Sequence, residues 1–129
     1  MAPVSHEEMQ PDEVFHRIGG GSVENLSLKP GERDLRPPGI SLFRGGTARQ
    51  AVEQMRQAFP RSLKWGRGQV LTVGTAELRA IREQGFDIMP DPTTRFPNHC
   101  RLIHSGLAAG FSDENLQKLS KVFVNREEH

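Results

Sequence analysis

The chemically richest stretch of the sequence is residues 91–106, DPTTRFPNHCRLIHSG. It contains the only cysteine of the chain, Cys100, and two of the five histidines, His99 and His104. A cysteine beside a histidine can form a nucleophile–base pair, and the two side chains together can bind zinc. The spacing of these residues decides which of these chemistries the stretch could support.

The apolar pattern of residues 101–104 predicts a short strand, in which successive side chains point to opposite faces. Cys100 and His104 then share one face but lie about 13 Å apart, because a strand rises ~3.3 Å per residue. This separation is too long for a nucleophile–base pair or for two ligands of one metal ion. We therefore expect no metal site, and we expect Cys100 to be a core residue.

The loop before this strand is a second candidate site. Asp91, Arg95, Asn98 and His99 are polar residues on a turn-rich segment, and loops on a rigid scaffold commonly carry functional groups. His99 could act as a general base that Asp91 or Asn98 orients. The pattern nevertheless favours a structural loop, in which Asn98 and His99 hold the backbone by hydrogen bonds.

Arg44 is a candidate phosphate ligand, because it ends a predicted strand and precedes Gly45, Gly46 and the start of a predicted helix. A strand that ends in arginine is similar to ADP-ribosyltransferase-like folds, where the arginine holds a phosphate of the nicotinamide cofactor. The Ser-Thr-Ser and Glu-x-Glu elements of one branch and the paired-tyrosine helix of another are missing. We therefore expect no cofactor, and a plain strand-to-helix turn is the simpler interpretation.

A basic segment follows, with six basic residues and one acid, Glu53, between residues 44 and 67. Its stretch RSLKWGRG places Trp65 among cations, which suits an acidic protein surface or nucleic-acid phosphates. The formal net charge of the chain is only +1, so bulk electrostatics does not draw it to nucleic acid. We expect a protein partner, with nucleic acid as the weaker alternative. The residues expected to bind are Arg61, Lys64, Trp65, Arg67, Arg95 and Asn98.

Hydrophobic periodicity predicts the elements that position these residues. Residues 47–59 carry an apolar stripe at helical spacing behind a Thr–Gln capping box. Thr75 and Ser112 are expected to cap two further helices. Residues 14–18 could be a short strand or the end of a brief helix that starts near Pro11. The other segments predicted as strands are residues 25–29, 40–43, 69–73, 86–89 and 101–104.

These elements predict an α+β fold: a small single domain with one mixed or mainly antiparallel sheet packed against about three amphipathic helices. The helices are expected to cover one face of the sheet, and residues 69–89 could form a βαβ crossover. We expect the domain to span residues 13–124, between a flexible acidic tail at 1–12 and a disordered tail at 125–129.

Other sequence features restrict the class of protein. A single cysteine excludes an internal disulfide, and the acidic N-terminal residues do not resemble a secretion signal. No apolar segment approaches the ~20 residues needed to cross a bilayer. We expect a soluble, cytoplasmic protein without membrane contact, and the arrangement of PPGISLFRGGT and GFDIMPDPTTRFPNH is similar to short standalone bacterial proteins. The sequence leaves the oligomeric state open.

Two functions remain. The favoured hypothesis is a non-catalytic interaction or accessory module that binds a protein through residues 61–67, which we call the basic-aromatic loop. The alternative is a small nucleotide- or nucleic-acid-directed enzyme or toxin-like effector, in which Arg44 binds phosphate and His99 or His104 transfers protons. The alternative requires Arg44, Asp91, His99 and His104 to meet in one pocket, so the relative placement of these four residues discriminates between the two.

Overall fold

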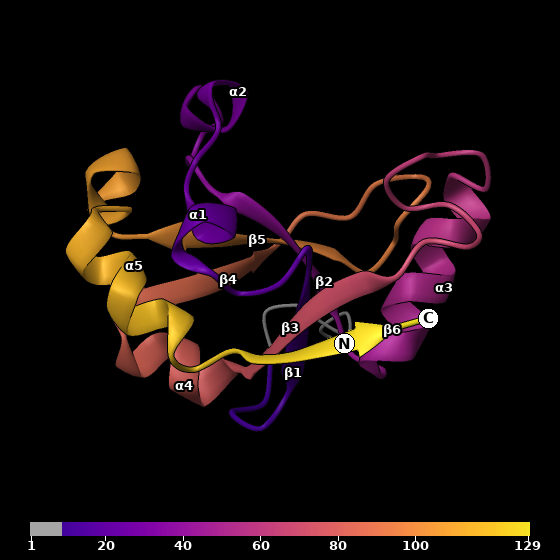
Figure 1. The fold of residues 1–129 in the computed structure, drawn as a ribbon. Coiled ribbons are helices and arrows are strands. Elements are labelled where there is room, and N and C mark those ends of the chain that lie inside the picture. Colours follow the sequence, from indigo (N-terminus) through magenta and orange to yellow (C-terminus); the bar gives the residue numbers. More distant parts are fainter. Residues whose placement is uncertain (1–8) are drawn as a thin grey trace, which may run out of the picture.

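A computed structural model describes residues 9–129, which form a six-stranded sheet with helices on both faces (Figure 1). The strands are β1 (Val14–Ile18), β2 (Ile40–Arg44), β3 (Leu71–Glu77), β4 (Phe86–Pro90), β5 (His99–His104) and β6 (Val124–Glu128). Their order across the sheet is β4-β5-β2-β1-β3-β6, and each pair of neighbours is antiparallel. The predicted α+β class is confirmed.

Five α-helices accompany the sheet within residues 9–129. They are α1 (Val23–Leu26), α2 (Pro30–Arg33), α3 (Ala48–Ala58), α4 (Leu78–Glu83) and α5 (Asp113–Ser120), and a 3-10 turn, η1 (Leu107–Gly110), precedes α5. The helices α1 and α2 are single turns of four residues each. The expected set of about three amphipathic helices is therefore not confirmed, and the sheet dominates the fold.

The two faces of the sheet pack against different helices. On one face, Phe15 and Leu42 belong to the main core, which also contains apolar residues of α1, α4 and α5. On the other face, Val52 of α3 packs with Leu71 and Val73 in a smaller cluster. The expectation that helices cover one face was wrong, because β3 carries buried apolar side chains on both of its faces.

The predicted start of α3 is confirmed in detail. The Thr47 hydroxyl accepts a hydrogen bond from the Gln50 amide (3.1 Å), and the Gln50 side chain accepts one from the Thr47 amide (2.9 Å). The helix buries Ala48, Ala51, Val52 and Met55, as the apolar stripe predicts. Ser112 caps α5 in the expected way, by accepting from the Asn115 amide.

Two local predictions were wrong. Residues 25–29 form no strand, because the Ser22 side chain caps α1, which extends to Leu26. Leu26 is buried within this helix, and Leu28 is buried after it. The helix expected after Thr75 begins only at Leu78, since β3 continues to Glu77. Three strands separate β3 from β4 in the sheet, so the two do not form a crossover between neighbouring strands.

The C-terminal residues were expected to be disordered from residue 125, and they instead form β6 at the edge of the sheet. Backbone pairing with β3 holds this strand, although its side chains are mostly exposed and gave no apolar pattern. The Asn125 side chain also accepts a hydrogen bond from the Gly21 amide (2.8 Å). Of the acidic tail expected at residues 1–12, the first eight lie outside the described residues.

The contact between β3 and the loop around Gly21 gives a stability test. A Cβ atom on Gly74 would lie 2.6 Å from the Gly21 backbone nitrogen and 3.0 Å from Asn125 Oδ1. Overpacking against backbone costs about 1–3 kcal/mol, so we expect Gly74→Ala to lower the free energy of unfolding in urea by that amount.

Gly31 provides the matched control, because a Cβ there meets no atom within 4 Å and the residue lies in α2. Gly31→Ala should leave the free energy of unfolding unchanged or raise it by about 0.5–1 kcal/mol. Equal stability of the two variants would show that β3 does not pack closely against the Gly21 loop.

Candidate functional site

The structure does not bring the four residues of the predicted catalytic pocket together. Phe43 is paired with His99, whereas its neighbour Arg44 is paired with Phe15. Because consecutive strand residues point to opposite faces, Arg44 and His99 project from opposite faces of the sheet. His104 is at the other end of β5 from His99. The strand register therefore separates residues that the enzymatic alternative requires in one pocket.

Arg44 forms an ion pair with Glu13 instead of facing an open anion site. The hydrogen bond from Arg44 lowers the pKa of the Glu13 carboxyl below its ordinary value, and the same bond raises the pKa of Arg44. Cys100 is buried, and burial raises the pKa of its thiol to about 11. The thiol form therefore predominates at neutral pH, and Cys100 packs in the main core.

Asp91 and His99 do lie together, and they form a polar cluster with Ser41 and Arg101. The His99 Nδ1 atom is 2.8 Å from the Asp91 carbonyl oxygen, and Nε2 is 2.8 Å from Ser41 Oγ. The Asp91 carboxylate accepts a hydrogen bond from Arg101 Nη2 (2.9 Å) and lies 3.4 Å from His99 Nδ1.

The partners of His99 determine its neutral tautomer. A carbonyl oxygen only accepts hydrogen bonds, so Nδ1 must carry the proton that points to Asp91. The Nε2 lone pair then accepts a hydrogen bond from the Ser41 hydroxyl. The cluster therefore has a hydroxyl directed at a base, and it also fastens the loop of residues 91–98 to the sheet.

Asn98 and His104 have structural contacts. The side chains of Asn98 and Gln54 exchange two hydrogen bonds (2.8 and 3.1 Å), which join α3 to the loop before β5. His104 accepts a hydrogen bond from the Gly106 amide (2.9 Å), and its ring packs edge-on against Phe86 at a centroid distance of 4.8 Å. His104 therefore closes the turn after β5, far from His99.

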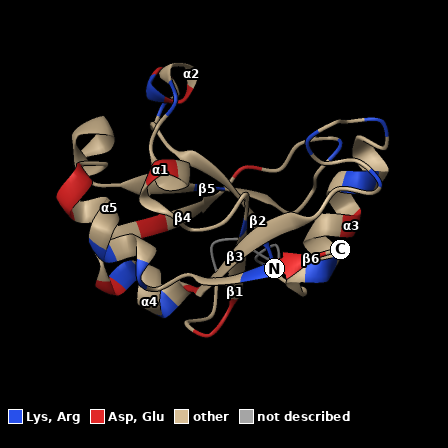
Figure 2. Cartoon of the chain, viewed as in Figure 1, with Lys and Arg blue, Asp and Glu red and all other residues tan. Residues whose placement is uncertain are grey.

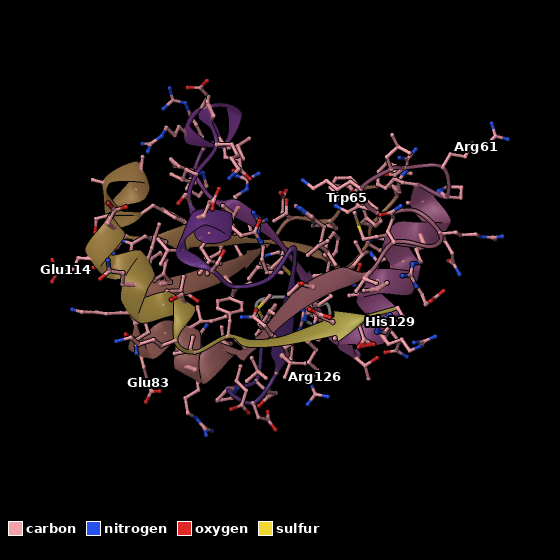
Figure 3. The ribbon with its side chains drawn as sticks, viewed as in Figure 1. Arg61, Trp65, Glu83, Glu114, Arg126 and His129 are labelled. Carbon is pink, nitrogen blue, oxygen red and sulfur yellow. The ribbon has the colours of Figure 1, made fainter. Side chains whose placement is uncertain are left out.

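The basic-aromatic loop, residues 61–67, follows the end of α3 and carries cations on its outside (Figure 2). Trp65 is half-buried and packs on Phe59, with ring centroids 5.5 Å apart, and Lys64 Nζ lies 5.4 Å from the tryptophan ring. Figure 3 shows Arg61 extending away from the body of the protein, whereas Trp65 turns toward it. Arg95 reaches this surface from the neighbouring loop and lies over the Phe59 ring at 5.1 Å.

Leu63 is the outermost apolar residue of this loop, with 91% of its surface exposed. Val70, where the loop returns to β3, is 51% exposed. Arg61, Lys64 and Arg67 belong to the same loop and Arg95 lies over Phe59, and none of these four cations forms an ion pair with a described residue. Sequence reasoning identified the cations and Trp65 but missed Leu63, whose exposure follows from the turn around it.

A cavity of about 610 Å³ lies on the α3 face of the sheet, and sequence reasoning did not find it. Its lining includes the buried His16 of β1 and the adjacent Thr75 of β3. The His16 Nε2 atom is 3.1 Å from each of the carbonyl oxygens of Gly45 and Gly46, and Nδ1 is 2.8 Å from Thr75 Oγ1. The carbonyls require a proton on Nε2, so Thr75 donates its hydroxyl proton to Nδ1.

The only sequence signal for this cavity is a histidine in the middle of an apolar strand segment, Val14–Ile18. A histidine in such a position is usually buried with satisfied hydrogen bonds. The hydrogen-bond partner of His16, Thr75, is 59 residues away along the chain. The pairing becomes visible only once the β1–β3 register is known.

Comparison with known proteins gives no functional information: no protein-family model, curated protein or solved structure matches this chain. Within residues 9–129, no three His, Cys, Asp or Glu side chains are grouped as metal ligands. The helices of the same residues are too short or too polar to cross a bilayer.

The shifted pKa values of His16 and Glu13 predict how the free energy of unfolding depends on pH. Burial lowers the pKa of His16 below its ordinary 6.5. Below this pH the unfolded chain binds a proton at His16 more readily than the folded protein does, so the free energy of unfolding falls. The hydrogen bond from Arg44 lowers the pKa of Glu13 below 4.5, so its contribution is present above that pH and is lost as the pH falls through the folded value. We expect the free energy of unfolding in urea to fall in two steps, below about pH 6.5 and below about pH 4.5.

Single substitutions assign the two steps. Glu13→Gln should keep the step below about pH 6.5 and weaken the lower one, whereas His16→Gln should remove the upper step. If the upper step persists in His16→Gln, another group is responsible and the buried neutral histidine does not control it.

Proposed function

We propose that this protein is an interaction module that binds an acidic segment of a partner protein through the basic-aromatic loop. The observation that carries the proposal is Leu63, which is 91% exposed in a loop whose cations form no ion pair within residues 9–129. A leucine so exposed contributes nothing to folding, whereas its burial against a partner would contribute about 1.5–3 kcal/mol.

Hydrogen bonds within the loop fix its conformation, and this favours a role in binding. The Ser62 hydroxyl accepts hydrogen bonds from the amides of Lys64 (3.1 Å) and Trp65 (3.0 Å), and the Gly66 amide donates to the Ser62 carbonyl (2.9 Å). A Cβ on Gly66 would lie 2.4 Å from that carbonyl, so the turn requires glycine. A preorganised loop loses little conformational entropy when it binds.

The charge of the loop supports an acidic protein as the partner. Residues 54–76 contain no aspartate or glutamate, and Arg61, Lys64 and Arg67 are all exposed. Trp65 is packed against the body of the protein rather than open to bases, so a stacking platform for nucleic acid is not favoured. Leu63 adds an apolar contact that an acidic peptide with one apolar side chain would complement.

The probe for this proposal is a fluorescein-labelled peptide of aspartates and glutamates around one central leucine. We expect binding by fluorescence anisotropy that weakens with added salt. Leu63→Ser should weaken it about tenfold, as loss of ~1.5 kcal/mol of apolar burial implies, and Arg61→Glu with Lys64→Glu should abolish it.

Lys118→Glu with Lys121→Glu, on the distant and equally exposed surface of α5, is the matched charge control and should leave binding unchanged. All of these variants should keep the free energy of unfolding within about 0.5 kcal/mol of the parent protein. Tighter binding of a single-stranded DNA oligonucleotide than of the peptide would replace this proposal with nucleic-acid recognition.

The second candidate function is proton transfer by His99, and the specific observation in its favour is the contact of its Nε2 atom with Ser41 Oγ at 2.8 Å. In this proposal Ser41 transfers its proton to His99 Nε2 as its oxygen attacks the acyl or phosphoryl centre of an ester. The bond from that centre to the ester's leaving oxygen breaks, and protonated His99 returns the proton to the departing alkoxide. Arg44, on the opposite face of the sheet, and His104, at the other end of β5, were included in the alternative hypothesis but have no role in this step.

An alkyl fluorophosphonate tests this second function, since it labels serines that an adjacent base activates. Labelling of Ser41, detected by mass spectrometry and lost in His99→Gln, is the result expected of an activated hydroxyl. Absence of labelling in the folded protein would leave Ser41 and His99 as loop anchors and remove the enzymatic alternative.

A further inference from the structure

We propose that the cavity beside His16 is a binding site for a small organic monocarboxylate with an apolar body. The cavity, about 610 Å³ in volume, falls in the range of small-molecule sites. It is formed where β1, β3 and β6 meet α3 and α4. It lies at the opposite end of α3 from the basic-aromatic loop, so it constitutes a separate site.

Most of the cavity wall is apolar. Val14 and Ala76 contribute from the sheet, Ala48 from α3, Ala80 from α4 and Val124 from β6. None of these side chains can form a hydrogen bond, so the wall suits a hydrocarbon or aromatic body.

Two exposed arginines line the cavity. Arg49 comes from the first turn of α3 and Arg126 from β6, and neither guanidinium is within ion-pair distance of a described carboxylate. Figure 3 shows Arg126 extending from β6 between α4 and the beginning of α3. A guanidinium presents donors that match the two oxygens of a carboxylate.

Two acids, Glu77 and Glu128, also line the cavity, so its four charged side chains sum to zero while His16 is neutral. The two glutamates would repel a dianion such as a phosphate monoester more strongly than they repel a monoanion, whose single charge the two arginines can bind. The charge balance therefore favours a carboxylate over a phosphate.

The His16–Thr75 pair orients the ligand. Because the Thr75 hydroxyl donates its hydrogen bond to His16 Nδ1, the Thr75 oxygen presents only lone pairs to the cavity. These lone pairs repel a carboxylate. The ligand's charged group is thereby directed to Arg49 and Arg126, and its apolar body lies toward β1 and α4.

The probes are benzoate and hexanoate, with benzyl alcohol, benzylamine and phenyl phosphate as neutral, cationic and dianionic comparisons. We expect the carboxylates to shift the amide NMR signals of Thr75 and Ala76 with dissociation constants of about 1 mM or less. Arg49→Gln with Arg126→Gln should weaken benzoate binding about tenfold, and Ala80→Leu should block it by filling the cavity.

Arg79→Gln is the control, because Arg79 is an exposed arginine of α4 that does not line the cavity. It should change the dissociation constant less than about twofold. Binding of benzyl alcohol, benzylamine or phenyl phosphate as tightly as benzoate would overturn the carboxylate assignment. Unchanged NMR signals with every probe up to about 10 mM would overturn the site itself.

Discussion

The hydrogen bonds of His16 determine how α3 sits on the sheet. One imidazole joins β1 to Thr75 of β3 and to the carbonyls of Gly45 and Gly46, the turn that leads into the helix. Both glycines have positive φ angles (73° and 71°), which other residues rarely adopt, and this backbone directs both carbonyls to one nitrogen. Burial keeps the imidazole neutral, so that it can donate and accept at the same time.

Both proposed binding surfaces depend on this placement of α3. The first turn of the helix lines the cavity, and its last turn leads into the basic-aromatic loop, ~16 Å away at 1.5 Å per residue. Between them, Gln54 exchanges hydrogen bonds with Asn98 and fixes the helix to the loop before β5. A rotation of α3 would therefore disturb both surfaces at once, although no residue belongs to both.

Sequence reasoning succeeded where the signal is local. The capping box of α3 and the Asp91–His99 contact, which spans eight residues, could be predicted from neighbouring positions. It left open what depends on strand register: Arg44 and His99 lie on opposite faces, and the His16–Thr75 contact joins residues 59 positions apart. The strand β6 was missed because backbone hydrogen bonds, which leave no side-chain pattern, hold it at the edge of the sheet.

The arrangement of charged side chains gives the basic-aromatic loop and the cavity different selectivities, although the net charge of the chain is only +1. The loop presents cations without acids on an open surface, and the contacts it offers are strong only for a partner that supplies several negative charges. The cavity balances two arginines against two glutamates inside partly apolar walls, where a single charge is enough. Arg49 and Arg126 are exposed, as are the cations of the loop, so salt screens the charges of both surfaces, and it is the apolar wall of the cavity that distinguishes the second site.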